Sequence, residues 1–260
     1  MMPLRIYLVA GFNGGSGRSL TAALLAYGLQ RHGRRPLLVR QTYAGSVSAT
    51  DPIGATLPVP CSRLVLPAPY ELPADLTAGL ATTIHDTDAR FMIALRNQAT
   101  AETGPDGDVV VDLCCHDRAC NAATISDAAV ILVPARASVL EIDWAVRSFS
   151  HIRDIQRCRD TPIPTLLAPI ASDDERARQM ALLGAMLREC DPEHHLVQGE
   201  PADVMVEAPF LDGASLTALL IERPIWRDPQ LTDRCRAFAA AVAARADAFM
   251  TVSMGDADDL

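Results

Sequence analysis

The stretch LRIYLVAGFNGGSGRSL, residues 4–20, decides the fold of this chain. Its first part, Leu4 to Ala10, is almost continuously apolar, which is typical of a strand buried on both faces of a sheet. A glycine-rich turn follows, and residues 18–31 then carry apolar side chains at helical spacing. Such a unit directs backbone N–H groups and the positive end of the helix dipole at one point, so the stretch predicts a phosphate-binding loop.

The alternation of short apolar runs with longer amphipathic segments continues along the chain. Strands that alternate with helices are joined by crossover connections. We therefore predict an α/β fold of the P-loop NTPase kind, doubly wound, with a mostly parallel sheet and helices on both faces. Further strands are expected at 36–39, 108–113, 128–134 and 164–168, and further helices at 138–157, 173–189 and 229–250.

The domain organisation follows from the same pattern. Residues 1–250 are expected to form a single domain, and residues 251–260 an acidic, flexible tail. The proline-rich stretch 51–73 is expected to be a loop that contains one short strand at 63–66. A capping box is predicted for the 138–157 helix, with Ser138 as the N-cap and Glu141 three residues later.

The composition argues against several classes of protein. Of the 260 residues 49% are hydrophobic, but no apolar run approaches the ~18 to 20 residues that a membrane-spanning helix needs. The first apolar run is short and lacks a small-residue cleavage site, so we expect a cytoplasmic protein. We expect no membrane attachment, because a membrane-targeting amphipathic helix at the carboxyl terminus would need a basic face and this tail is acidic. The seven cysteines, an odd number, favour reduced thiols over a disulfide framework.

The chain contains no lysine, and all 23 of its lysine-or-arginine positions are arginine. The net charge of −9 opposes binding of a polyanion, so contact with DNA would need a local basic patch. The carboxyl-terminal region offers a candidate patch, although its interleaved acidic residues equally suit an ordinary solvated surface. The arginines of this candidate patch are Arg223, Arg227, Arg234, Arg236 and Arg245.

The glycine-rich turn and the start of its helix form the candidate nucleotide site. Ser19 stands where such loops place a Mg²⁺ ligand, and Arg18 stands where a lysine normally reaches the β and γ phosphates. A tight turn that binds nothing is the alternative, because glycine-rich turns are common. The expected nucleotide-binding residues are Asn13, Gly14, Gly15, Ser16, Gly17, Arg18, Ser19 and Leu20.

The order of residues from Asn13 to Ser19 resembles the deviant Walker A box of the ParA/MinD-type ATPases, K-G-G-x-G-K-[ST]. The resemblance implies a dimer that binds ATP and Mg²⁺, with Ser19 and Asp112 at the metal, and that partitions or positions DNA or a protein cargo. Later segments are similar to that family in the same order: 40–46 to its switch segment, 108–112 to its Walker B strand, 125–142 to the next strand and helix, and 207–216 to a late segment.

Four of the chain's departures from the pattern of that family affect charged residues. Arg18 and Asn13 replace the two lysines of the box, and Arg40 and Thr42 replace the two aspartates of the switch segment. Phosphoryl transfer depends on the placement of such charges, so we expect nucleotide binding with weakened or absent hydrolysis. The alternative function is a non-enzymatic scaffold or nucleotide-sensing regulator within a secretion, conjugation or polysaccharide-synthesis assembly.

A cluster of thiols and an imidazole, formed by Cys114, Cys115, His116 and Cys120, follows the predicted Walker B strand. Zinc binding or redox switching is one interpretation, because ligands bind at the carboxyl ends of strands in doubly wound folds. Incidental thiols are the other, because no second Cys-x-x-Cys pair completes a site. We interpret the pair His194-His195 as the edge of a strand.

Overall fold

The computed structural model describes residues 4–11, 15–43, 52–66, 80–113, 122–157, 161–191 and 200–255. Several sequence-based predictions concern residues outside these ranges. They are Asn13 and Gly14 of the loop, the cluster from Cys114 to Cys120, the His194-His195 pair and the last part of the expected tail, 256–260.

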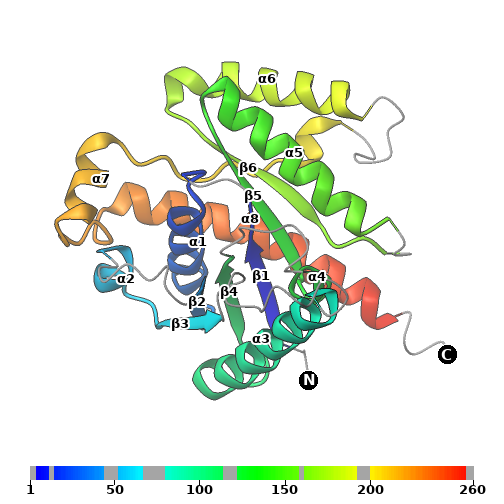
Figure 1. Ribbon diagram of the computed structural model, residues 1–260. Coiled ribbons are helices and arrows are strands. Elements are labelled where there is room, and N and C mark those ends of the chain that lie inside the picture. The colour runs from blue at the N-terminus through cyan, green and yellow to red at the C-terminus, as the bar shows by residue number, and fades with distance from the viewer. Residues whose placement is uncertain are drawn as a thin grey trace.

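The strands of the described ranges form one sheet in which every pair is parallel (Figure 1). The strand order is β3-β2-β4-β1-β5-β6, so β1 lies between β4 and β5. This order confirms the prediction of a doubly wound α/β fold. The bounds are β1 Arg5–Val9, β2 Pro36–Tyr43, β3 Cys61–Leu66, β4 Asp108–Asp112, β5 Val130–Arg136 and β6 Thr165–Ile170.

The helices agree with the sequence pattern at α1, α5 and α6, and they differ from it elsewhere. The long α3 was not predicted, and the short α2 lies inside the expected loop. The helix α8 continues to Gly255, five residues into the segment expected to form the tail. The bounds are α1 Arg18–Arg31, α2 Pro52–Thr56, α3 Leu80–Thr103, α4 Ala122–Ser126, α5 Val139–Ile155, α6 Asp173–Cys190, the 3₁₀-helix η3 Pro201–Val204, α7 Gly213–Leu220 and α8 Pro229–Gly255.

The helices cover both faces of the sheet (Figure 1). On β1, Tyr7 and Val9 pack toward α1 and α8, whereas Ile6 and Leu8 pack toward α3 and α5. Because successive side chains of a strand point to opposite faces, a central strand covered on both sides must be apolar at every position. Among the described residues, no helix combines the length and apolar character needed to span a membrane.

The helix α1 is held by a close crossing with α8. A Cβ atom added to Gly28 would lie 2.1 Å from the carbonyl oxygen of Cys235, so only glycine allows the two backbones to approach this closely. Next to it, the hydroxyl of Tyr27 donates a hydrogen bond to the carbonyl of Trp226, and the two aromatic rings are 5.1 Å apart. These contacts fix the position of the helix whose first turn follows the glycine-rich loop.

A buried charge cluster fixes the amino-terminal end of the sheet, away from that loop. Arg34 Nη1 lies 3.2 Å from Asp108 Oδ1 and donates to the hydroxyl of Tyr7 at 3.0 Å, while Arg34 Nη2 binds Asp247 of α8. Arg5 Nε also lies 2.9 Å from Asp247 Oδ1. Burial raises the pKa of Asp108 even though Arg34 and Arg5 oppose this shift. The cluster joins α8 to β1 and β4, and we assign it a structural role.

Candidate functional site

The loop between β1 and α1 lies at the point where the sheet changes its winding direction. The strand β1 is flanked by β4 on one side and by β5 on the other, and the loop leaves its carboxyl end. In open α/β sheets, ligands bind outside the carboxyl ends of the strands at this switch point. The fold therefore places the glycine-rich stretch where a ligand site is expected.

Two glycines of this loop have backbone conformations that other residues rarely adopt. Gly15 has a φ of 77° and Gly17, the N-cap of α1, has a φ of 88°. A Cβ atom on Gly17 would also lie 3.0 Å from Ile170 Cδ1, so a side chain there meets both backbone strain and crowding. The first turn of α1 has no side-chain cap and no acidic residue, which leaves its N–H groups and dipole suited to an anion.

The side chain of Arg18 folds back across the end of the sheet. Its Nη1 donates a hydrogen bond of 2.5 Å to the carbonyl of Leu113, the residue that follows β4. A Cβ atom built on Gly11 would lie 3.4 Å from Arg18 Cδ, so the arginine stem passes over the end of β1. Arg18 thus carries its positive charge to the space above β1 and β4, beside the start of α1.

Asp112, the expected Mg²⁺ ligand at the end of β4, has a cationic partner. Arg40 Nε of β2 lies 3.2 Å from Asp112 Oδ2, and their side chains are only 19% and 7% exposed. The two residues are register partners on neighbouring strands, so their side chains extend from the same face of the sheet. Arg40 therefore neutralises the carboxylate that was expected to meet a metal.

Among the described residues, those around Asp112 do not fit a Mg²⁺ site, because Arg40 is paired with the carboxylate. Magnesium binds hard oxygen ligands, usually one or two carboxylates, in near-octahedral geometry. Here the carboxylate is bound by a guanidinium, which stays protonated at any pH a protein survives. Within the described ranges, no group of three or more His, Cys, Asp and Glu side chains is arranged to hold a metal ion. Ser19, the other expected ligand, is half-buried on the first turn of α1.

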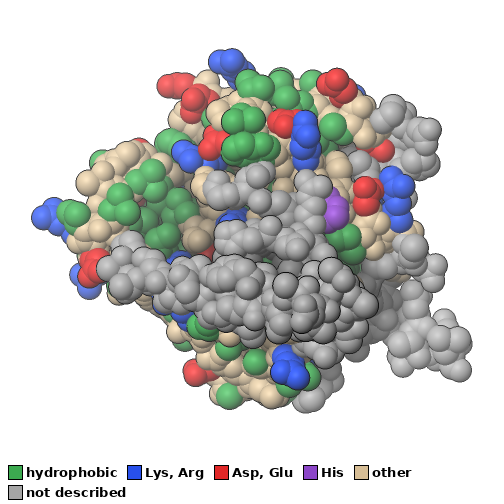
Figure 2. Space-filling view, in the orientation of Figure 1, with side chains coloured by type: hydrophobic (Ala, Val, Ile, Leu, Met, Phe, Trp, Pro, Cys, Tyr) green, Lys and Arg blue, Asp and Glu red, His purple; other side chains and the backbone are tan. Residues whose placement is uncertain are grey.

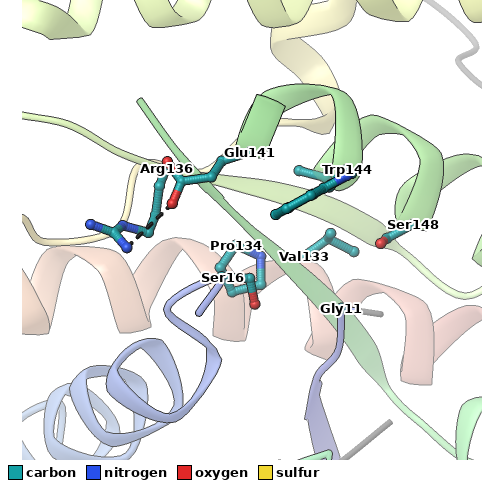
Figure 3. Close-up of a pocket in the computed structure, with 9 residues that line it drawn as sticks. Gly11, Ser16, Val133, Pro134, Arg136, Glu141, Trp144 and Ser148 are labelled. Atoms are coloured by element: carbon teal, nitrogen blue, oxygen red, sulfur yellow. Dashed lines mark ion pairs between the residues drawn. The ribbon is translucent and has the colours of Figure 1, made fainter. Parts of the chain in front are cut away.

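A second arginine, which the sequence analysis missed, reaches the loop from β5. Arg136 Nη1 donates to the carbonyl of Gly15 at 3.3 Å and lies 3.2 Å from Glu141 Oε1 (Figure 3). Glu141 belongs to the predicted capping box with Ser138, which the structure confirms. Arg136 ends an otherwise buried apolar strand, and that position, the carboxyl end of a parallel strand, is the signal that could have identified it.

Between the loop and α5 lies a cavity of about 10 Å³, which has room for about one water molecule (Figure 3). Ser16 and Gly11 line it from the loop side, and Trp144 and Ser148 line it from α5. The hydroxyl of Ser16 is buried and has no hydrogen-bond partner among the described residues. Ser16 therefore lies against the residues of β5 and α5 that line this cavity.

A larger cavity of about 430 Å³ opens on the other side of the start of α1. Gly17 and Leu20, two of the expected nucleotide-binding residues, form part of its wall. The opposite wall comes from the end of β6 and from the segment before α7. The remaining lining residues are Arg136, Ala137, Ser138, Glu141, Ile170, Glu175, Phe210, Leu211 and Leu216.

A third cavity, a groove of about 470 Å³, lies between α8 and the segment after β6. Two arginines of the candidate DNA patch, Arg234 and Arg245, line it together with Arg176. Arg176 is paired with Glu207 at 3.2 Å, and Arg245 donates to the carbonyl of Asp203 at 3.3 Å. The structure thus brings part of the predicted patch together, while Arg236 is paired with Asp233 on its own helix.

No protein-family model matches the chain, and the curated proteins contain no match to it. Solved structures do share its fold. McdA from Cyanothece, in a complex with ATP, has 14% identity and a TM-score of 0.55 over 94% of this chain and 98% of that chain. MinD from Aquifex aeolicus has 12% identity and a TM-score of 0.51 over 92% of this chain and 97% of that chain. Cobyrinic acid a,c-diamide synthase from Mycobacterium smegmatis, with bound ADP and magnesium, has 20% identity and a TM-score of 0.51 over 92% of this chain and 94% of that chain. At these identities the likeness establishes that the chain shares the overall fold of these structures.

Proposed function

We propose that the chain is a divergent member of the ParA/MinD-type ATPases and binds an adenine nucleotide at the loop between β1 and α1. The observation that carries this proposal is the position of the first turn of α1. It lies at the switch point of the sheet, without a side-chain cap, between Arg18 on one side and the 430 Å³ cavity on the other. A helix N-terminus in that setting suits a phosphate group.

The 430 Å³ cavity would hold the base and sugar of the nucleotide. Its volume falls within the range of about 300–1,000 Å³ that is typical of small-molecule sites. Leu20, Phe210 and Leu211 offer apolar contact to a flat ring, and Ser138 and Glu175 offer polar atoms at the rim. Mostly apolar walls with a few polar groups are what such ligands need.

The phosphates would lie against the first turn of α1, where three sources of positive potential meet. The backbone N–H groups and dipole of α1 supply one. Arg18 supplies the second, because its guanidinium already lies over the ends of β1 and β4. Arg136 supplies the third from β5, and its contact with the carbonyl of Gly15 holds it beside the loop.

The same geometry supports weak or absent hydrolysis. A transferring phosphoryl group needs charges and an attacking water that are fixed in position. Arg18 binds the carbonyl of Leu113, and its forked guanidinium does not reproduce the compact charge of a lysine. Asp112 is paired with Arg40, so the charge of this carboxylate at the end of β4 is compensated. These features favour retention of a nucleotide over its turnover.

A homodimer is the assembly that we propose, because exposed apolar side chains flank the nucleotide cavity. Figure 2 shows hydrophobic side chains gathered over α7, where Leu220 is 71% exposed and Ile221 56%. Val139 and Leu140 are exposed at the start of α5. The helices α5 and α7 both border the cavity, so a second copy that covered these side chains would also cover the nucleotide.

The cellular role that we propose is the positioning of DNA or a protein cargo in the cytoplasm. The groove with Arg176, Arg234 and Arg245 supports non-specific contact with a phosphate backbone, which depends on clustered positive charge. The runner-up role is a nucleotide-sensing scaffold that holds a partner without turnover. The Arg40–Asp112 pair favours this second role, because it removes a charge that catalysis would use.

Measurement of ATP binding and ATP turnover on the same preparation tests the proposal. We expect ATP to bind in equilibrium dialysis, with hydrolysis at background level in the presence or absence of duplex DNA. A folded chain that retains no ATP in dialysis would overturn the nucleotide site. Turnover well above background would keep the site but contradict weakened hydrolysis, and it would favour the positioning role over the scaffold.

A further inference from the structure

The ion pair between Arg40 and Asp112 is built into the sheet. The two residues occupy opposite positions in the register of β2 and β4, so the strand pairing itself brings their side chains together. Both side chains are largely shielded from water, with exposures of 19% and 7%. A carboxylate removed from water needs a cation, and Arg40 supplies one that does not lose its proton.

This pair places a permanent cation where a divalent metal would have to bind. For Asp112 to accept Mg²⁺, directly or through a water ligand, it would share one negative charge between the metal and the guanidinium. The guanidinium would have to leave its carboxylate, or two cations would lie within a few ångströms in a poorly solvated place, and both arrangements are unfavourable. Arg40 thus competes with the metal in the way that a bound cation would.

The positive charge that a metal normally brings to phosphates is available from this chain's own side chains. Arg18 reaches the end of β4 through its bond to the carbonyl of Leu113, and Arg136 contacts the carbonyl of Gly15. Both groups lie beside the first turn of α1, which adds its dipole. Guanidinium groups bind phosphate oxygens with paired N–H donors, so a diphosphate can be held without a metal.

We infer that this site binds adenine nucleotides in their metal-free form, with Arg40 in the role of the missing magnesium toward Asp112. The inference rests on the proposed nucleotide site and specifies which form of the ligand that site takes. It predicts that magnesium does not improve binding. Because Mg²⁺ in solution also sequesters the free nucleotide, added magnesium leaves the apparent affinity unchanged or lowers it.

Titration of the purified wild-type chain with ADP, in EDTA and then in excess Mg²⁺, tests the inference. We expect the dissociation constant in EDTA to be equal to or smaller than that in Mg²⁺. A dissociation constant at least about tenfold smaller in Mg²⁺, which corresponds to 1.4 kcal/mol, would overturn the inference and leave the nucleotide site intact. A folded chain that binds no ADP in either buffer would overturn the nucleotide site and the inference together.

Substitution of Arg40 adds a test that is specific to the ion pair. Arg40→Gln keeps an N–H donor toward Asp112 but removes the charge, and we expect Mg²⁺ to tighten ADP binding to this variant by about tenfold or more. Arg40→Lys keeps the charge, and Arg63→Gln removes the arginine at the same register position on β3, so both should behave as the wild type does. If circular dichroism shows that Arg40→Gln is folded and its affinity for ADP is still the same with and without Mg²⁺, the role given to Arg40 is contradicted. If Arg40→Gln does not fold, the wild-type titration decides.

Discussion

The crossing of α1 and α8 makes Gly28 a position where the effect of a single added methyl group can be worked out from the structure. In Gly28→Ala the new Cβ would lie 2.1 Å from the carbonyl oxygen of Cys235 and 2.8 Å from Ala239 Cβ. To reach the 3.4 Å of an ordinary contact the helices must separate by about 1.3 Å, and overpacking of this kind costs about 1–3 kcal/mol. The intrinsic preference of alanine for helix offsets about 0.8–1 kcal/mol. Because the obstructing atom is backbone, we expect a net loss of about 1–2 kcal/mol.

Urea denaturation, with Gly184→Ala as the matched control, measures this loss. Gly184 is also a helical glycine, but the nearest heavy atom to its added Cβ is 3.7 Å away, so only the helix preference acts. We expect Gly184→Ala to raise the free energy of unfolding by about 0.5–1 kcal/mol and Gly28→Ala to lower it. A Gly28→Ala variant as stable as the wild type would refute the close crossing, and with it the claim that α8 fixes the position of α1.

Three further predictions concern single side chains. In calorimetric titrations, Arg136→Ala should weaken ADP binding by about tenfold but AMP binding less, because a charge near the outer phosphate is lost. Arg147→Ala is the control: it removes an exposed arginine of α5 that is paired with Asp143, and it should change the binding of neither nucleotide. Arg18→Lys should raise any residual ATP hydrolysis, because it restores a compact ammonium, and an unchanged or lower rate would show that the site depends on arginine. Burial raises the pKa of the Cys235 thiol to about 12, so roughly one molecule in 10⁴ carries the thiolate at pH 8. Peptide mass spectrometry should therefore find the exposed Cys61 alkylated in the native protein and Cys235 alkylated only after unfolding.

The sequence was sufficient to predict the largely apolar strands β1, β5 and β6, together with the helices α1, α5 and α6 that follow them. It misjudged β2, which was expected to end at 39 and continues to Tyr43. The extra residues include Arg40 and Thr42, which are polar and do not fit the pattern of a buried strand. Arg40 belongs to the strand because its charge is met by Asp112 on β4, a partner 72 residues away. The polar end of the strand depends on this distant partner, and local hydrophobicity cannot indicate it.

The helix α3 was missed although part of the signal was present. Its buried apolar residues Phe91, Met92, Leu95 and Ala99 have helical spacing, but they span only nine residues of a helix of 24. The first turn contains no acidic residue, so the usual indication of a helix start was lacking. A helix stabilised mainly by the sheet that it covers carries little local signal of where it begins.

The place of the glycine-rich loop between the first strand and the first helix could be predicted, but the arginine contacts around it could not. Gly15 and Gly17 stood out in the sequence because a positive φ favours glycine. The contacts of Arg18 with Leu113 and of Arg136 with Gly15 join residues 95 and 121 positions apart. They depend on the order of non-consecutive strands, which a single sequence does not specify.

Calorimetric titration of the chain and of its Gly17→Ala variant with ADP tests the nucleotide site most directly. In the wild type we expect saturable binding of one ADP per chain. Gly17→Ala forces a φ of 88° on a residue with a side chain and crowds Ile170, so it should distort the first turn of α1 and abolish binding while the fold survives. No binding by the folded wild type, or equal binding by the folded variant, would contradict a phosphate site at the start of α1.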